Sequence, residues 1–381
     1  MSTRTRFAIA TGAAGALGAL AVAAGRTGRD VGVQIGGIPD GARLARMQRS
    51  AQWREGRFRN RDRRAGDAPA ADSIGARDVA RRFLLERSQR SPSVEVPVRA
   101  DGVALPQDGL HFTWTGHASV LTSMDGEHLL FDPVWSERCS PSAHVGPRRL
   151  HALPCDLEDL PAISAVVISH DHYDHLDMAT IRSLHELQPH CEFVVPLGVG
   201  AHLERWGLAS SQIVELDWDE KHHVGSIELT PVASQHFSGR GLHRNNTLWA
   251  SWVARSPAGS VYFSGDTGYF SGFEEIRDAF GPFDVAFMAI GMYDPAWVAM
   301  HLNPEEAVQA ACELGASLAA PIHWCTFALA PHAWSEPPER FVVAAEEAGL
   351  AYVIPEVGEA VDAAARTRGS NGARPWWRPA P

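Results

Sequence analysis

Residues 170–175, with the sequence His-Asp-His-Tyr-Asp-His, carry the strongest chemical signal in the chain. Three imidazoles and a carboxylate this close together are costly to bury in an apolar core, whereas they are ligands that divalent metals such as zinc prefer. His170 and His172 can point to one position, and Asp174 and His175 can point to a second position nearby. The stretch therefore predicts two metal ions a few ångströms apart, with a solvated polar turn as the alternative.

Three further residues of the same chemical types, His236, Asp266 and His323, stand where predicted apolar strands end. Polar side chains at strand ends converge on one edge of a sheet, where binding sites are commonly built. Each of them alone would more often be structural. Together with residues 170–175 they complete a ligand set for two ions, which disfavours the solvated turn.

The seven candidate ligands divide into two groups and a bridge. One ion is expected to bind three imidazoles, those of His170, His172 and His236. The other ion is expected to bind one carboxylate and two imidazoles, those of Asp174, His175 and His323. Asp266 would bridge the two ions, because a carboxylate has two oxygens to share.

Two more residues are predicted to support these ligands. Asp132 follows the apolar stretch 127–131 and would accept the free N–H of a ligand imidazole, which fixes the orientation of the ring. His117 is expected to be structural or to orient a ligand in the same way. Other histidines, including His151 and His202, are expected in loops or on the surface.

The residues around the stretch 170–175 predict the elements that position it. Residues 163–168 are an apolar run typical of a buried strand, and Asp177 stands at the start of an apolar stripe with helical spacing. The stretch would therefore lie on the turn between the end of a strand and a helix. From residue 111 onward strands and helices alternate, and two sheets with outer helices are the natural packing for this order.

Length and composition are those of a globular protein. The 381 residues, 45% of them hydrophobic and 21% charged, suffice for one large domain or two small ones. The five cysteines are odd in number, widely spaced and without a C-x-x-C pair. We therefore expect free thiols that are buried or half-buried, and neither a disulfide framework nor a zinc ribbon.

The net charge of -11 is unevenly distributed along the chain. Residues 1–100 carry 19 arginines against 9 acidic residues, whereas residues 101–381 carry 15 basic residues against 36 acidic ones. The basic N-terminal part could meet anionic lipid or nucleic acid. The body, with a net charge of -21, is unsuited to binding a long polyanion, so we expect no nucleic-acid partner.

The N-terminal residues resemble a targeting segment. Residues 1–25 combine Arg4 and Arg6 with an uncharged run from Phe7 to Gly25, as in a secretory signal or a weak membrane anchor. This favours a membrane-associated or exported protein of a bacterial cell envelope, with a cytoplasmic location as the alternative. The remaining chain is expected to divide into a basic, partly disordered arm with short helices, a catalytic domain and a tail: 26–105, 106–365 and 366–381.

The order of the candidate ligands resembles that of the metallo-β-lactamase superfamily. Within it, a set of short motifs is similar to the N-acyl-phosphatidylethanolamine-hydrolysing phospholipase D family and its bacterial relatives. These motifs are Trp114–Ala118, Phe131–Pro133, Gly146–Arg149, His170–Asp177, Gly265–Tyr269, Phe273–Ile276, Gly281–Asp284 and His323–Leu329. The similarity is dense over roughly residues 110–345 and does not extend into residues 1–100.

This resemblance implies an α+β fold, a four-layer αββα sandwich with the metals at the edges of the sheets. It also implies two zinc ions per chain, although histidine and carboxylate ligands alone would equally suit iron or manganese. His301 would lie near the phosphate of the substrate. Cys325 departs from the family, in which a glycine is expected, and a thiol there would alter access to the site or make it sensitive to oxidation.

The expected activity is hydrolysis of a phosphodiester. Two cations that share a water lower its pKa from about 15.7 toward about 7, so that hydroxide forms at neutral pH. This hydroxide would attack the phosphorus of an N-acyl-phosphatidylethanolamine-like phospholipid, as in a phospholipase D. The residues with catalytic roles would be Asp174, Asp266 and His301.

Other activities are compatible with the same ligands. A lactonase or another ester or thioester hydrolase acting on a small soluble substrate is the first alternative, and a nuclease is disfavoured by the acidic body. A non-catalytic, membrane-associated binding protein is the alternative of another class, disfavoured because all seven ligands are present. A phospholipid or small phosphodiester substrate and a membrane surface are the expected partners, and a homo-oligomer is compatible with the sequence.

Overall fold

The computed structural model describes most of the chain, and the described residues are 27–61, 76–85, 87–93, 95–241, 243–368 and 375–378. The segment predicted to be a signal or membrane anchor, residues 1–25, lies outside these ranges. Within them, no helix has the length and apolar character needed to cross a membrane.

Two mixed β-sheets form the centre of the fold. The first has the strand order β15-β3-β4-β5-β6-β7-β8, and the second has the order β14-β13-β12-β11-β10-β9. The strands of the first sheet are β3 (Leu110–Gly116), β4 (Ser119–Met124), β5 (Glu127–Phe131), β6 (Ala165–Val167), β7 (Glu192–Pro196), β8 (Ile213–Leu216) and β15 (Ala360–Asp362). Those of the second are β9 (His222–Val224), β10 (Ile227–Val232), β11 (Ser251–Ser256), β12 (Gly259–Phe263), β13 (Val285–Ala289) and β14 (Ala319–Ile322).

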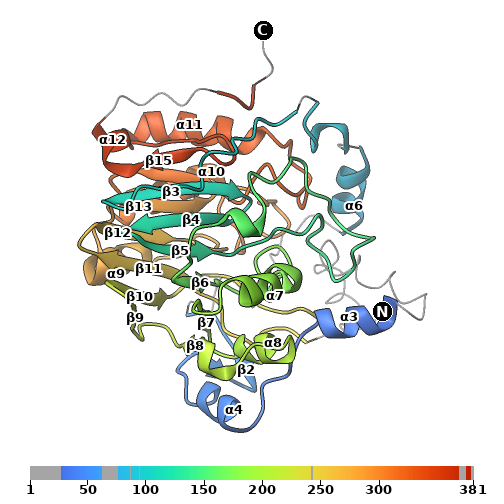
Figure 1. The fold of residues 1–381 in the computed structure, drawn as a ribbon. Coiled ribbons are helices and arrows are strands. Elements are labelled where there is room, and N and C mark those ends of the chain that lie inside the picture. Colours follow the sequence, from blue (N-terminus) through green and yellow to red (C-terminus); the bar gives the residue numbers. More distant parts are fainter. Residues whose placement is uncertain are drawn as a thin grey trace.

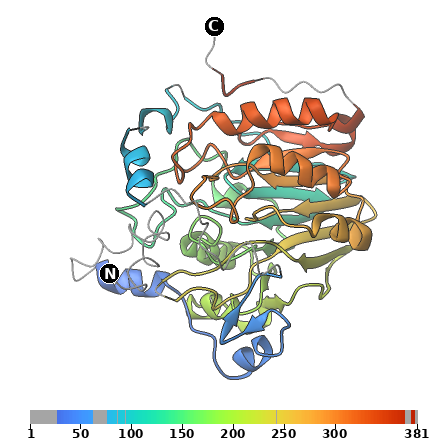
Figure 2. The ribbon, with the colours of Figure 1, turned by 180° about the vertical axis from the view of Figure 1, so that it is seen from behind.

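Helices cover the outer faces of the sheets, so that the layers follow the order αββα. Figure 1 shows α7 and α8 in front of the first sheet, and Figure 2 shows the helices of the second sheet from behind. These helices are α7 (Met178–Leu187), α8 (Gly200–Arg205), α9 (Phe273–Phe280), α10 (Pro304–Glu313), α11 (Glu336–Ala348) and α12 (Ala363–Arg368). Short 3-10 helices lie in the connections, at Leu157–Asp159 and Ser210–Gln212. The predicted α+β sandwich is confirmed.

Aromatic side chains pack between the two sheets. The ring of Phe112 on β3 meets that of Phe287 on β13 edge-on at 4.9 Å, and Phe131 on β5 stacks on Phe263 of β12 at 4.7 Å. The neighbouring Leu130 belongs to a second apolar cluster, which it shares with residues of α7 and α8. Strands that are buried on both faces have continuous apolar sequences, which explains why these strands show little alternation.

The turn that carries residues 170–175 lies between β6 and α7, as the sequence predicts. Strand β6 is fully buried and pairs in parallel with β5 and β7. Helix α7 begins at Met178, and the Asp177 carboxylate accepts a hydrogen bond from the backbone N–H of Ala179, which caps the helix. A central strand and a capped helix thus fix both ends of the turn.

The described part of the N-terminal arm packs on the domain. It contains α3 (Thr27–Gln34), α4 (Gly41–Met47) and a hairpin of β1 (Trp53–Arg54) and β2 (Arg57–Phe58). Met47 and Phe58 are buried and belong to the same apolar cluster as the residues between the sheets. Arg43 forms ion pairs with Glu204 at 2.8 Å and with Glu215 at 2.6 Å. Residues 27–61 therefore pack on the hydrophobic core of the domain and do not form a separate core.

Residues near the C-terminus also reach the core. The ring of Trp376 stacks on Trp324 at 5.2 Å, and Trp324 stacks in turn on Trp114 of β3 at 5.5 Å. Trp377 is buried, and its indole N–H donates a hydrogen bond to Glu339 on α11. This tryptophan stack ties the C-terminal residues to the segment that directly follows His323.

Because Phe58 is fully buried, Phe58→Ala is expected to lower the free energy of unfolding by about 3–5 kcal/mol. Urea unfolding followed by circular dichroism measures this change. Arg57→Ala, an exposed neighbour on the same hairpin, is the control and should stay within about 0.5 kcal/mol of the wild type. Equal stability of the two variants would mean that the arm is not docked on the core.

Candidate metal centre

The loops that follow β6, β10, β12 and β14 meet at one edge of the two sheets, together with the turn between β3 and β4. They bring all seven predicted ligands into one buried to half-buried group, which His117 joins. Since the ligands come from both sheets, the packing of the sheets determines the distances between the ligands.

The first predicted group is brought together as expected. His172 Nδ1 lies 2.9 Å from His170 Nε2 and 3.4 Å from His236 Nε2. The Asp266 carboxylate closes the group, with its Oδ2 3.5 Å from His236 Nε2 and 3.8 Å from His170 Nε2. Four donor atoms thus surround one position.

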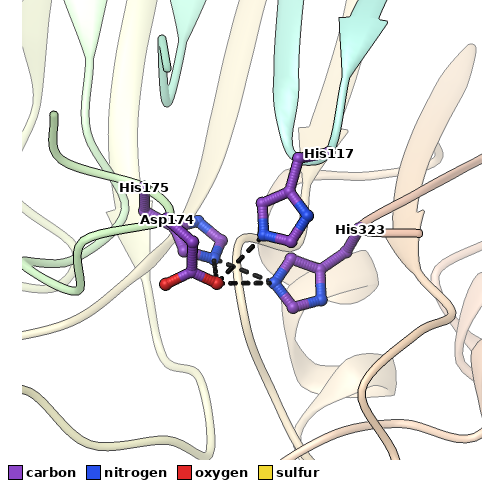
Figure 3. A group of neighbouring side chains, drawn as sticks. All are labelled: His117, Asp174, His175 and His323. Carbon is purple, nitrogen blue, oxygen red and sulfur yellow. Dashed lines mark hydrogen bonds and ion pairs between the residues drawn. The ribbon is translucent and has the colours of Figure 1, made fainter. Parts of the chain in front are cut away.

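The second predicted group is shown in Figure 3. His323 Nε2 lies 3.0 Å from His175 Nε2, and both nitrogens lie 3.6 Å from Asp174 Oδ2. The same carboxylate oxygen contacts His117 Nε2 at 2.9 Å. The loop after β6 supplies Asp174 and His175, whereas His117 and His323 come from opposite sheets.

Asp266 lies between the two groups. Its Oδ1 is 2.9 Å from His323 Nε2, and its Oδ2 is 3.3 Å from His175 Nε2 and 3.5 Å from His236 Nε2. The carboxylate therefore faces donor atoms of both groups, as the predicted bridge requires.

The donor atoms fit metal ions better than they fit one another. Tetrahedral ligands with metal bonds of about 2.0–2.1 Å lie roughly 3.3 Å apart, close to the separations in both groups. Asp266 Oδ1 is buried and, despite its short distance to His323 Nε2, accepts no hydrogen bond from any described residue. A buried carboxylate oxygen without a hydrogen bond is costly, and a cation at this position would satisfy it.

Partners outside the cluster fix the orientation of the imidazoles. His175 Nδ1 donates a hydrogen bond to Asp132 Oδ2 at 2.7 Å, and the backbone N–H of Ser169 donates to Asp132 Oδ1 at 2.7 Å. His236 Nδ1 donates to the Met300 carbonyl at 2.9 Å. In both rings the Nε2 atom is therefore left to face the cluster, and Asp132 lies where an orienting residue was predicted.

Both carboxylates of the cluster are held in the ionised form. Burial alone would raise the pKa of Asp174, but the charge of His175, the hydrogen bond from His117 and the nearby ring of His323 hold it well below its usual value. At Asp266 burial is likewise outweighed by the charges of the surrounding histidines, and its pKa is also lowered. The cluster thus carries the negative charge that a cation needs.

His117 lies closer to the centre than the sequence indicates. Its ring is 4.1 Å from that of His323, and burial together with His323 lowers its pKa to about 3. The neutral ring can donate its Nε2 hydrogen to Asp174 and so orient this carboxylate. An orienting role was predicted, but contact with a candidate ligand from the second group was not.

His301 borders the cluster on the side of Asp266. Its Nδ1 lies 3.8 Å from Asp266 Oδ2, and its ring is 5.1 Å from that of His236. Burial lowers the pKa of His301 to about 4, so the ring is neutral at physiological pH. It stands beside the carboxylate that lies between the two groups.

Several buried polar residues around the site were missed or misplaced from the sequence. His151 lies in a loop, as expected, but is buried, whereas His202 is buried within α8, which corrects its expected place in a loop or on the surface. His151 Nε2 contacts the Thr326 hydroxyl at 2.9 Å, and that hydroxyl accepts the backbone N–H of His117. His202 Nε2 lies 3.2 Å from Asp171. Their positions in the sequence gave no signal, because each partner comes from a distant part of the chain.

Asp171, the second residue of the stretch 170–175, stabilises the turn and does not face the metals. Its carboxylate accepts hydrogen bonds from the Gly239 backbone N–H at 2.6 Å and from the Thr247 hydroxyl at 3.0 Å. The buried guanidinium of Arg240 donates to the Asp171 carbonyl at 2.8 Å. These bonds attach the loop after His236 to the turn that carries four of the candidate ligands.

Comparisons with known proteins agree with this geometry. Residues 127–324 match the family described as the Beta-lactamase superfamily domain. The chain belongs to the metallo-β-lactamase superfamily. The predicted superfamily is thereby confirmed, and the protein is a metal-dependent hydrolase of this superfamily with a histidine and aspartate cluster for metal.

Individual relatives include enzymes and uncharacterized proteins. An uncharacterized protein of Mycobacterium tuberculosis is 43% identical over 339 residues, which cover 87% of this chain and 88% of the relative. The N-acyl-phosphatidylethanolamine-hydrolyzing phospholipase D 1 of Caenorhabditis elegans is 37% identical over 232 residues, which cover 58% of this chain and 65% of that enzyme. A metallo hydrolase from Ignicoccus hospitalis shares the fold, with a TM-score of 0.53 and 21% identity over 66% of this chain and 97% of that structure.

The contact between Asp132 and His175 predicts an effect on metal binding. Asp132→Asn replaces one acceptor oxygen by an N–H donor, and we expect metal affinity to fall by about 10–100-fold. Metal content of the purified protein at buffered free zinc concentrations measures the effect. Glu158→Gln, the same chemical change at an exposed residue, is the matched control, and equal affinities in the two variants would contradict the orienting role.

The buried position of Cys325 predicts low reactivity of its thiol. Burial raises the pKa of Cys325, so the reactive thiolate is scarce at neutral pH, whereas Cys312 is exposed. In the folded protein, Cys312 should react first with Ellman's reagent, and Cys312→Ser should remove the fast phase. A fast phase that is lost in Cys325→Ser instead would support the oxidation-sensitive site considered from the sequence.

Proposed function

We propose that this metal-dependent hydrolase is a binuclear phosphodiesterase of phospholipase D type that acts on N-acyl-phosphatidylethanolamine-like phospholipids. The observation that carries the proposal is the pair of donor groups joined by Asp266. They occur in a chain 37% identical, over 232 residues, to an enzyme named for that reaction. A pair of metal sites a few ångströms apart suits the in-line displacement at a phosphodiester.

The residues that would hold the ions are those of the two groups. The first ion would be held by His170, His172, His236 and Asp266. The second would be held by Asp174, His175, His323 and Asp266. Bound there, two divalent cations would activate a water as the nucleophile and offset charge on the phosphoryl oxygens. Zinc is the metal we propose, and iron or manganese would suit the same ligands.

The side chains of the site would divide the remaining work. Attack of water oxygen on phosphorus would break the bond to the ethanolamine oxygen, and N-acylethanolamine would leave with a proton. His301, a neutral imidazole beside Asp266, can donate a hydrogen bond to a phosphoryl oxygen or to the departing oxygen. Asp174 and Asp266 are ionised and would keep the cations in place throughout the reaction.

Exposed apolar side chains in the segment before His301, and on the helix tied to it, suit a substrate with acyl chains. Val298, 51% exposed, lies in the segment that leads to His301. Leu85, 67% exposed, lies on α6 (Ala76–Leu85), which is tied to that segment by an ion pair between Arg82 and Asp294 at 2.8 Å. These residues support a membrane surface as partner. Attachment through residues 1–25 and a homo-oligomer stay predictions.

The alternatives differ in what the metals would act on. A lactonase or thioester hydrolase would use the same ligands on a carbonyl carbon, whereas a nuclease would have to hold a polyanion on a body of net charge -21. A non-catalytic binding protein would not need a complete set of seven converging ligands. The density of donors around Asp266 therefore favours an enzyme.

The test is hydrolysis of N-acyl-phosphatidylethanolamine vesicles by the zinc-loaded full-length protein. We expect release of N-acylethanolamine and phosphatidic acid, quantified by mass spectrometry. His172→Ala should lower the rate by about 100-fold or more, because it removes a ligand and not only its support. If both metals bind and a soluble phosphodiester or lactone is hydrolysed but the vesicles are not, the lipid substrate is wrong while the hydrolase stands.

A further inference from the structure

The side chain of Asn60, in the N-terminal arm, holds the main chain at His236. Its Nδ2 donates a hydrogen bond to the His236 carbonyl at 2.9 Å, and its Oδ1 accepts the His236 backbone N–H at 3.1 Å. The amide thereby pairs with His236 as a neighbouring β-strand would. No position in residues 1–100 was predicted to take part in the site.

Asn60 is itself fixed on several sides. Its Oδ1 also accepts the indole N–H of the buried Trp249 at 3.1 Å, and its carbonyl accepts a hydrogen bond from Arg54 at 3.0 Å. Two residues earlier, Phe58 is buried in the core, and its backbone N–H donates to the Asn245 carbonyl at 2.9 Å. The arm therefore presents the Asn60 amide in one orientation.

The backbone of Gln235 and the ring of His236 have other hydrogen-bond partners, whereas the backbone of His236 is bonded to Asn60. The preceding residue, Gln235, is bonded to the loop of Asp266: its N–H donates to the Thr267 hydroxyl at 2.9 Å, and its carbonyl accepts the Gly268 N–H at 2.8 Å. The His236 ring is oriented through Nδ1 by Met300. The hydrogen bonds of Asn60 fix the peptide groups of His236 itself. The preceding residue, the ring and the backbone of His236 are thus all held in place.

We propose that Asn60 is a positioning residue of the metal centre, through which the N-terminal arm contributes to the metal site. The inference rests on the proposed role of His236 as a metal ligand. A ligand must be held to within about 0.5 Å of its productive place, and the ring of His236 moves with its backbone. Loss of the Asn60 amide would therefore lower the affinity for the ion held by His236. The affinity for the other ion, held by Asp174, His175 and His323, would fall less.

The experiment measures zinc per chain in the full-length protein over a series of buffered free zinc concentrations. Asn60→Ala removes both hydrogen bonds to His236, and Asn60→Asp keeps the acceptor but replaces the donor. His236→Ala and His323→Ala each remove a candidate ligand from one of the two groups, and they serve as references for the loss of zinc from that group. Arg57→Ala, an exposed residue on the same hairpin, is the matched control, and circular dichroism of the metal-free proteins reports the fold.

Asn60→Ala should require at least about tenfold more free zinc to fill one position, the same position that His236→Ala empties. The other position should fill as in the wild type, Asn60→Asp should shift in the same direction, and Arg57→Ala should not shift.

Wild-type binding of both ions by Asn60→Ala would overturn the proposal. The proposal would also be overturned if both Asn60 variants lost both ions and no longer gave the circular dichroism spectrum of the native protein. Asn60 would then be needed for folding and not specifically for the metal centre. A wild type that binds a single ion would refute the proposed binuclear centre instead. The role of Asn60 would then be judged by whether Asn60→Ala lowers the affinity for that ion, as His236→Ala does.

Discussion

Imidazole nitrogens approach one another at the shared edge of the two sheets to distances at which each pair needs a proton or a cation between them. His170 Nε2 lies 2.9 Å from His172 Nδ1, and His175 Nε2 lies 3.0 Å from His323 Nε2. His175 Nδ1 donates its hydrogen outward to Asp132, and although burial opposes it, the carboxylates of Asp266, Asp174 and Asp132 hold the pKa of this ring well above its usual value. A metal ion would take the place of such a proton between the inward nitrogens, and the fold has to keep these nitrogens together.

The fold meets this requirement by holding the rings of His175 and His236 through their outer nitrogens and by fixing the backbone of His323. Asp132 and Met300 fix two of the rings, and the backbone N–H of His323 donates to the His117 carbonyl at 2.7 Å, which joins the second sheet to the first across the site. The aromatic pairs between the sheets set the distance over which these bonds must reach. Sheet packing and metal geometry therefore depend on each other.

The architecture and the convergence of the candidate ligands could be predicted from the sequence because that information is local. Residues 170–175 are contiguous, and Asp132, Asp266 and His323 follow apolar strands, so that their convergence at a sheet edge could be inferred. The contribution of Asn60 could not be inferred, because it lies 176 residues from His236 and a single asparagine in a basic arm has no pattern. The burial of His151 was missed for a similar reason, since its ring contacts Thr326, 175 residues away.

The tryptophan stack near the C-terminus shows that the folded unit extends beyond residues 127–324, the range that matches the family model. Residues 127–324 contain all seven candidate ligands, yet Trp376 and Trp377 lie after that region and pack on Trp324, the neighbour of His323. A protein shortened to residues 127–324 would contain all seven candidate ligands. It would, however, leave the ring of Trp324, next to His323, without the tryptophans that pack on it. The folded unit that supports the last candidate ligand is therefore longer than the range that matches the family model.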